Sequence, residues 1–177
     1  ADAFLDEAKY DDVSGYSEPS ESAHDFFCIG HTSTSVILAS GLAKARDLAD
    51  ENYNVIAVIG DGSLSGGEAL EGLDFAKELN GNLIVVVNDN EMSIAENHGG
   101  LYENLKLLRD TKGQAECNIF KAMGLNYVFV EDGNDLTQLI DAFKRVKDSK
   151  APVAVHIHTL KGKGYTLAEE NKESWHW

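Results

Sequence analysis

The sequence predicts an α/β fold in which a doubly wound, mainly parallel sheet carries helices on both faces. Two observations support this: short apolar segments alternate with helical patterns, and small polar clusters follow the apolar segments. Strands that alternate with helices over this length form right-handed βαβ units and hence a parallel sheet. Ligands of such sheets lie at the carboxyl ends of the strands, where the polar clusters are expected.

The chain divides into an arm and one domain. Residues 1–25 are polar and acidic and indicate a surface arm with little regular structure, whereas residues 26–177 carry the alternating pattern. The expected strands cover residues 26–29, 54–59, 83–87, 127–130 and 153–157. The run at 26–29 indicates a short buried strand, and the continuous β-branched run at 54–59 is typical of a strand covered on both faces.

Three helices are expected between these strands. The first covers about residues 34–50 and the second residues 68–79. The third precedes the last strand, with Asn134 or Asp135 as its N-cap. Its apolar residues recur at helical spacing and are Leu136, Leu139, Ile140, Phe143 and Val146.

The composition limits the classes of partner. The chain has 177 residues, and its 15 basic and 30 acidic residues give a net charge of −15, which disfavours nucleic acids and anionic membranes. An anionic cofactor would need local help from a cation, a helix N-terminus or lysines. No run is long and apolar enough to span a bilayer.

The cysteines and the ends of the chain bear on its location. Cys28 and Cys117 have neither metal-ligand spacing nor a disulfide framework, so we expect packing thiols in a reducing, cytoplasmic compartment. No export leader opens the chain. Its start at Ala1 rather than Met and its abrupt end at Trp177 favour a fragment.

Three strand ends carry polar clusters, at residues 30–33, 60–65 and 88–93. In the second cluster, two glycines flank Asp61 at the exit of a strand, and a helix follows, which suits the close approach of an anion. A carboxylate beside a phosphate is repulsive unless a cation lies between them, and Mg²⁺ prefers oxygen ligands and bridges proteins to phosphates. Asn90, 29 residues after Asp61, can offer a second ligand from the neighbouring strand end.

Other interpretations of these residues are weaker. Gly-Asp-Gly alone is most often a turn. An EF-hand fails because its twelfth position would be Gly72, and a dinucleotide fingerprint fails because Gly-x-Gly-x-x-Gly is absent. His156 and His158 alternate on one strand, but no third metal ligand accompanies them, so we expect structural roles. His24 and His98 are expected at the surface.

Taken together, the motifs resemble the 1-deoxy-D-xylulose-5-phosphate synthase family of the transketolase superfamily. The spacing from Gly60-Asp61-Gly62 to Asn90 is similar to the thiamine-diphosphate motif, and Asn88-Asp89-Asn90-Glu91-Met92-Ser93-Ile94 is more specific to the family. Gly30-His31-Thr32-Ser33-Thr34-Ser35 precedes them, and Lys161-Gly162-Lys163-Gly164-Tyr165 with His176 follows them, in the family's order.

The resemblance implies a thiamine-diphosphate-binding fold and a set of site residues. Mg²⁺ would be held by the side chains of Asp61 and Asn90 and by the backbone carbonyl of Met92. The implied cofactor-binding residues are Gly30, His31, Thr32, Gly62, Ser63, Asn90 and Tyr165. His31 and His176 are the implied catalytic residues.

Further residues gain weaker assignments from the same resemblance. Lys161 and Lys163 would add positive potential near the cofactor, although a merely solvated pair is the alternative. Glu71 takes the place of an acidic residue near the family's dimer interface. The segment 98–123 is shorter than in typical members, which leaves open a branch with another acceptor.

The implied activity is a two-carbon transfer of isoprenoid biosynthesis that condenses pyruvate with glyceraldehyde 3-phosphate to 1-deoxy-D-xylulose 5-phosphate, with loss of carbon dioxide. Thiamine diphosphate would be the electron sink, and the protein would supply position and electrostatics. The implied partners are a pyrimidine-binding domain of the same or another chain and a second subunit in a homodimer, so residues 1–177 alone are expected to be inactive. The alternatives are a transketolase-like transfer from ketose phosphates and a cofactor-binding half-subunit that needs a partner chain.

Overall fold

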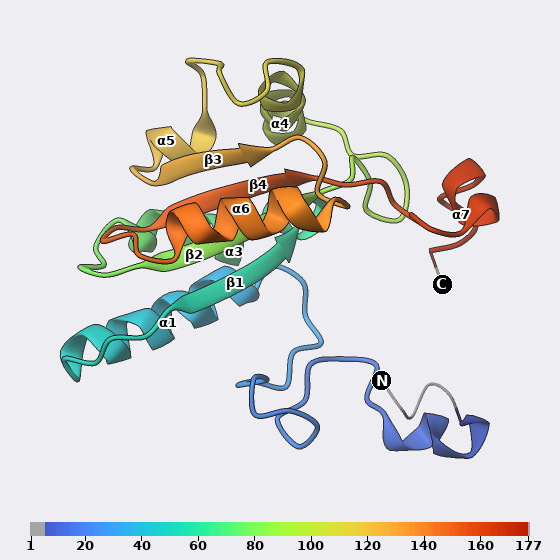
Figure 1. The fold of residues 1–177 in the computed structure, drawn as a ribbon, viewed down its shortest axis with the longest axis horizontal. Coiled ribbons are helices and arrows are strands. Elements are labelled where there is room, and N and C mark those ends of the chain that lie inside the picture. The colour runs from blue at the N-terminus through green and yellow to red at the C-terminus, as the bar shows by residue number, and fades with distance from the viewer. Residues whose placement is uncertain (1–5, 177) are drawn as a thin grey trace.

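The structure, a computed structural model that describes residues 6–176, contains a four-stranded parallel sheet in the order β1-β2-β4-β3. The strands are β1 (Val55–Gly60), β2 (Leu83–Asp89), β3 (Asn126–Val130) and β4 (Val153–His158). Their carboxyl ends lie at one side of the sheet, on the right of Figure 1. The prediction of a parallel α/β sheet is confirmed.

Helices lie on both faces of the sheet and enclose two hydrophobic cores. On one face, α1 (Ser35–Leu48) and α3 (Gly67–Ala76) pack on β1 and β2, and α4 (Gly100–Asp110) and α5 (Ile119–Ala122) extend this core. On the other face, α6 (Leu136–Val146) packs through Ala142 and Val146 on the central strands (Figure 1). The expected Asp135 N-cap is confirmed, because its side chain accepts a hydrogen bond of 2.7 Å from the Thr137 N–H.

Three short helical segments complete the described chain. The 3₁₀ helix η2 (Glu7–Asp12) lies in the N-terminal arm, which otherwise consists of turns, bends and the bridge residue Ser17; residues 1–5 of that arm lie outside the described residues. The helix α2 (Asp61–Leu64) follows β1 directly, and α7 (Thr166–Glu170) lies near the carboxyl ends of the strands (Figure 1). No helix within residues 6–176 has the length and apolar character needed to cross a membrane.

The predicted strand at 26–29 is wrong. Only an isolated antiparallel bridge joins Ile29 to Ser17, and Phe26 is 65% exposed. The segment does not join the sheet, so no ladder of backbone hydrogen bonds stabilises an extended strand there.

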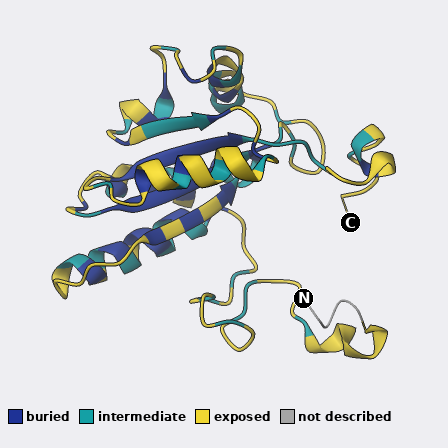
Figure 2. Cartoon of the chain, viewed as in Figure 1, coloured by how far each residue is buried: buried dark blue, intermediate teal, exposed yellow. Residues whose placement is uncertain are grey.

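The prediction that β1 is covered on both faces is also wrong. Its residues alternate between buried and exposed, and the side chains of Ile56 and Val58 are 53% and 63% exposed (Figure 2). The register places these two residues on the same face of the sheet as Ile84 and Val86. On that face α6 packs on β2, β3 and β4 but not on β1. As the edge strand, β1 therefore leaves an apolar strip uncovered in the described chain.

The two cysteines are not packing thiols as expected, because both are exposed. The Cys28 thiol donates a hydrogen bond of 2.9 Å to Glu18, which raises the pKa of the thiol. Cys117 lies beside Asn104, which donates to its backbone oxygen at 3.0 Å.

Candidate functional site

The carboxyl ends of β1 and β2 meet at a cavity of about 1020 Å³. Asp61, the first residue after β1, lines it together with Asn90 and Met92, which follow β2. Because β1 and β2 are parallel neighbours, residues separated by 29 positions in the chain reach one space. The three residues that the sequence suggested as metal ligands therefore share a cavity.

The cavity is strongly acidic. Eight acidic and three basic residues line it, and Asp61 itself is only 2% exposed. Burial, and next the charge of Asp89, raise the pKa of Asp61 to about 6. The Asn97 amide donates a hydrogen bond of 3.0 Å to Asp61 but does not offset this repulsion. A buried carboxylate under such repulsion is suited to a divalent cation.

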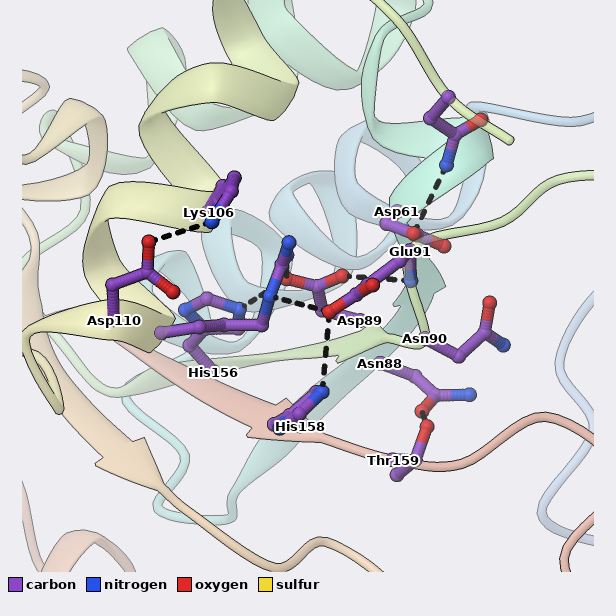
Figure 3. A network of polar contacts seen from close by, with 12 residues as sticks. Asp61, Asn88, Asp89, Asn90, Glu91, Lys106, Asp110, His156, His158 and Thr159 are labelled. Carbon is purple, nitrogen blue, oxygen red and sulfur yellow. Dashed lines mark hydrogen bonds and ion pairs between the residues drawn. The ribbon is translucent and has the colours of Figure 1, made fainter.

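Asp89, the last residue of β2, is fully buried beside Asp61 (Figure 3). Burial by itself would raise the pKa of Asp89, but His156 and then Arg109 outweigh burial and lower it to about 2. The His156 Nε2 lies 2.8 Å from Asp89 Oδ2, and Arg109 forms an ion pair with the same oxygen. Arg109 and His156 thus balance the charge of Asp89, whereas the described side chain that bonds to Asp61 is the neutral Asn97 amide.

The loop after β2 holds a strained residue between the two candidate ligands. Glu91 has a φ of 71°, in the left-handed region that costs a non-glycine residue about 1–3 kcal/mol. Its backbone N–H donates to Asp89 Oδ1 at 3.1 Å, and its carboxylate lies 3.1 Å from the Nε of Arg109. The Asn90 side-chain oxygen accepts from the Met92 N–H at 3.1 Å, which leaves its second lone pair for a ligand.

The first cluster of the sequence lies against the second. Ser33 Oγ donates a hydrogen bond of 2.9 Å to the backbone oxygen of Ser63. The Ser33 side chain also fills the space where a Cβ on Gly66 would lie. His31 is exposed, and its Nδ1 lies 2.6 Å from the Thr32 carbonyl.

The third cluster contacts both the second cluster and the later motif of residues 161–165 with His176. A Cβ on Gly62 would collide with the Ser93 side chain, so the glycine allows the two loops to touch. Lys161 donates a hydrogen bond to the Ser93 carbonyl, and its Nζ lies 3.0 Å from His176 Nδ1. The three clusters and the motif of residues 161–165 with His176 are therefore joined by direct contacts.

Not every suggested site residue lines the cavity of Asp61. Gly30, His31 and Thr32 lie outside its lining; the adjacent Ser33 contacts Ser63, two residues after Asp61. The remaining suggested residues also lie outside the lining: Gly62, Ser63, Glu71, Lys161, Lys163, Tyr165 and His176. Tyr165 is 49% exposed and packs edge-on against Trp175.

Sequence reasoning missed the residues that support the loop. Asp89 was not singled out within Asn-Asp-Asn, and Arg109 carries no motif. His156 was expected to be structural, and the structure places it, fully buried, between Asp89 and the Tyr127 hydroxyl, 2.8 Å from each. The strand-end position of Asp89 was the one available signal.

The donors fit a metal held jointly with a phosphate. Within residues 6–176, no group of three or more His, Cys, Asp and Glu side chains could hold a metal ion. A carboxylate, an amide oxygen and a backbone carbonyl make a hard oxygen set that is incomplete without further ligands. Mg²⁺ commonly completes such a set with phosphate oxygens and water.

Fold and cavity together define a class: an α/β protein whose parallel strands end in an acidic cavity with oxygen donors suited to a divalent cation. The profile of the family described as 1-deoxy-D-xylulose-5-phosphate synthase matches residues 1–117 and 107–159. The chain belongs to this family.

Curated relatives agree with this membership. The chain is 40% identical to the 1-deoxy-D-xylulose-5-phosphate synthase of Pelotomaculum thermopropionicum over 199 residues, which cover 93% of this chain and 31% of the relative. It is 37% identical to the synthase of Clostridium acetobutylicum over 210 residues, which cover 99% of this chain and 34% of the relative. The chain thus spans about a third of the length of the curated relatives it matches.

The aligned length differs from the length of this chain. The alignment with the Clostridium acetobutylicum synthase spans 210 positions, whereas this chain has 177 residues, so the relative carries residues that this chain lacks. The family match divides at residues 107–117, inside the segment 98–123. There the chain passes from α4 to α5 through a turn in which Gly113 packs against Tyr127 and Phe129.

Proposed function

We propose that this chain is the diphosphate-binding domain of a thiamine-diphosphate- and Mg²⁺-dependent transferase that forms 1-deoxy-D-xylulose 5-phosphate from pyruvate and glyceraldehyde 3-phosphate, with loss of carbon dioxide. The observation that carries the proposal is the shared cavity of Asp61, Asn90 and Met92 in a member of this family. The donor set and the acidic lining both call for a divalent cation before an anion can bind.

In this proposal Asp61 and Asn90 hold Mg²⁺ through their side-chain oxygens and Met92 through its backbone carbonyl. Asp61 is ionised in the bound state, since metal ligands must lose their protons. Asn90 and Met92 add no charge, which suits an ion that also neutralises a diphosphate. The ion relieves the repulsion between Asp61 and Asp89 that raises the pKa of Asp61.

The diphosphate contacts come from the loops around the ion. Gly62 and Ser63 offer backbone N–H groups to the diphosphate. Gly30, His31 and Thr32 line the part of the cofactor site beyond them. Tyr165 closes over the cofactor. Lys161 contributes positive charge to a loop that it already contacts at Ser93, and Lys163 lies two residues farther along the same segment.

When bound, thiamine diphosphate supplies a nucleophilic carbon for the ketone of pyruvate and an electron sink for the loss of carbon dioxide. This chain's residues orient the reactants and move protons. Lys161 can only donate, so His176 Nδ1 is the acceptor in their contact of 3.0 Å, and Nε2 is the ring nitrogen available to carry a proton. His176 and His31 are the groups that we assign to proton transfer at the reaction centre.

The proposal requires more protein than residues 1–177. A pyrimidine-binding domain supplies the groups at the other end of the cofactor, and the active unit is a homodimer with Glu71 near the subunit contact. We place the enzyme in the cytoplasm. The isolated chain is expected to lack activity.

The test is release of labelled carbon dioxide from [1-¹⁴C]pyruvate by the full-length protein. We expect release that requires glyceraldehyde 3-phosphate, thiamine diphosphate and Mg²⁺, with 1-deoxy-D-xylulose 5-phosphate as the product by mass spectrometry. Transfer from a ketose phosphate without release from pyruvate would replace the proposal by a transketolase-like activity. Activity only after addition of a second chain would assign this protein as a half-subunit.

A further inference from the structure

Side chains from three neighbouring strands form a buried chain of hydrogen bonds that the proposed function does not use. The Tyr127 hydroxyl of β3 lies 2.8 Å from His156 Nδ1 of β4, and His156 Nε2 lies 2.8 Å from Asp89 Oδ2 of β2 (Figure 3 shows His156 and Asp89). His156 and Asp89 are both fully buried. Arg109 of α4 forms an ion pair with the same Asp89 oxygen.

The direction of these hydrogen bonds follows from the groups involved. The Asp89 carboxylate can only accept, so His156 Nε2 carries a proton and donates it. In the tautomer with its single proton on Nε2, the ring accepts the Tyr127 O–H at Nδ1, 2.8 Å away. Burial, and next the charge of Asp89, raise the pKa of Tyr127, which keeps the hydroxyl protonated as a donor.

This chain of bonds ends at the loop of residues 90–92, which carries the proposed ligands Asn90 and Met92 and is called the metal loop below. Asp89 Oδ2 is held by His156 and Arg109, which leaves Oδ1 to accept the Glu91 N–H at 3.1 Å. Glu91 lies between Asn90 and Met92 and has the left-handed φ of 71°. A conformation of this kind persists only when its surroundings fix it, and the Asp89–Glu91 bond is one such constraint.

We propose that Asp89, His156 and Tyr127 are positioning residues that fix the Asn90–Met92 loop in the shape that binds the divalent cation. The inference rests on the proposed function, since it assigns Asn90 and Met92 as ligands. It adds that the affinity of the site depends on residues that touch neither metal nor substrate. Groups that orient metal ligands typically contribute about 10- to 100-fold to metal affinity.

The experiment measures Mn²⁺ binding to the full-length protein in the presence of thiamine diphosphate, by electron paramagnetic resonance of the free ion. The His156→Leu variant removes both hydrogen bonds. The His156→Gln variant keeps an N–H donor near the Nε2 position and is the conservative rescue. Tyr127→Phe is a milder change that removes one hydroxyl, and Val155→Ala weakens the neighbouring core of β4 without touching Asp89.

The expected result is a Kd for Mn²⁺ raised about 10- to 100-fold by His156→Leu, with a smaller increase in Tyr127→Phe and substantial recovery in His156→Gln. Val155→Ala is expected to lower the thermal midpoint while leaving the Kd within about twofold, since Val155 lies in the core on the α6 face of the sheet, whereas His156 packs against Phe120 on the other face. If His156→Leu does not fold, Tyr127→Phe decides the inference by the same measurement. Kd values unchanged in the folded variants would overturn it, as would an equal loss in Val155→Ala.

This result is separable from the proposed function. If the unmodified protein and the Asp61→Asn variant bind Mn²⁺ equally, the metal site itself is misassigned and the proposed function fails. If Asp61→Asn loses Mn²⁺ binding and the His156 and Tyr127 variants keep it, the metal site is supported and the positioning roles of His156 and Tyr127 are wrong.

Discussion

Asp61 and Asp89 are neighbouring buried carboxyl groups at the ends of adjacent strands, yet their pKa values move in opposite directions. Burial and then Asp89 raise the pKa of Asp61 to about 6, whereas His156 and Arg109 overcome burial and lower the pKa of Asp89 to about 2. One carboxylate is neutralised by the protein, and the other requires a proton or a cation. This division of roles leads to the first two predictions.

Metal binding is expected to weaken steeply in acid. Below about pH 6 a proton competes with the ion for Asp61, so the affinity for Mn²⁺ should fall about tenfold per pH unit between pH 6 and pH 5. Between pH 7 and pH 8 it should be nearly constant. Isothermal titration with Mn²⁺ at several pH values measures the profile, and an affinity that stays flat down to pH 5 contradicts it.

The raised pKa of Asp61 also predicts how the stability of the metal-free protein depends on pH. The folded pKa of Asp61 lies above its unfolded value, so this group's stabilisation is present at low pH and is lost as pH rises from about 4 to about 6. Asp61→Asn should therefore raise the metal-free thermal midpoint near pH 8 and abolish the additional rise on adding Mg²⁺ with thiamine diphosphate. Differential scanning calorimetry measures both effects.

Asp74→Asn is the matched control for this variant, because Asp74 is exposed on α3 and does not line the cavity. It should leave both midpoints unchanged. A lower metal-free midpoint in Asp61→Asn would show that Asp61 is satisfied without a cation.

The four strands of the sheet were predictable from the sequence because runs of apolar, β-branched residues are typical of buried strands. The run at 54–59 identified β1, but a continuous apolar run does not reveal whether a helix covers its second face, and Ile56 and Val58 proved exposed. The strand at 26–29 failed because strand formation depends on a partner that the local sequence does not encode. The order β1-β2-β4-β3 is likewise a tertiary property.

The site was predictable where it followed strand ends and not where it depended on side-chain packing. Asp61 and Asn90 follow directly from the rule that parallel strands end on one side. The contact of Asp89 with His156 joins residues 67 positions apart, and that with Arg109 joins a strand to a helix 20 positions later. No local pattern encodes such pairs.

The contact between Gly62 and Ser93 predicts a strict requirement for glycine. A methyl group on Gly62 would collide with the Ser93 side chain, so Gly62→Ala should separate the two loops, destabilise the fold by about 1–3 kcal/mol and weaken cofactor binding. Adding Ser93→Gly removes the colliding atoms and should recover part of the loss. Urea unfolding and fluorescence titration with thiamine diphosphate measure the two effects.

Gly67→Ala is the control for that substitution, because a Cβ at this first position of α3 meets open space. It should be neutral or slightly stabilising, since alanine favours helix. A Gly62→Ala variant that behaves like Gly67→Ala would remove the assignment of Gly62 as a contact point between the loops.

His176 is expected to affect turnover rather than cofactor binding. Replacing a general acid–base group typically costs about 10²- to 10⁴-fold in rate, so His176→Ala in the full-length enzyme should lower kcat by that range. Lys161→Met should lower it less, because the ring remains but loses the contact of 3.0 Å that orients it. Steady-state kinetics with a parallel Kd for thiamine diphosphate separates the two effects, and unchanged kcat in His176→Ala excludes its catalytic role. His24→Ala, an exposed histidine far from these contacts in the chain, is the control.

Replacement of Arg46 is expected to lower the stability of the fold without weakening metal binding. It is 3% exposed and donates hydrogen bonds of 2.9 and 2.6 Å to the carbonyls of Tyr53 and Asn82, which precede β1 and β2 at the amino ends of the strands. Arg46→Met leaves these carbonyls and Asp47 without their partner and should cost about 3–5 kcal/mol in urea unfolding. The Kd for Mn²⁺ of the folded variant should not change, because the metal loop lies at the opposite ends of the same strands. A weakened Kd in this variant would mean that general loosening of the sheet reaches the metal loop, and a cost below about 1 kcal/mol would contradict the stabilising role of Arg46.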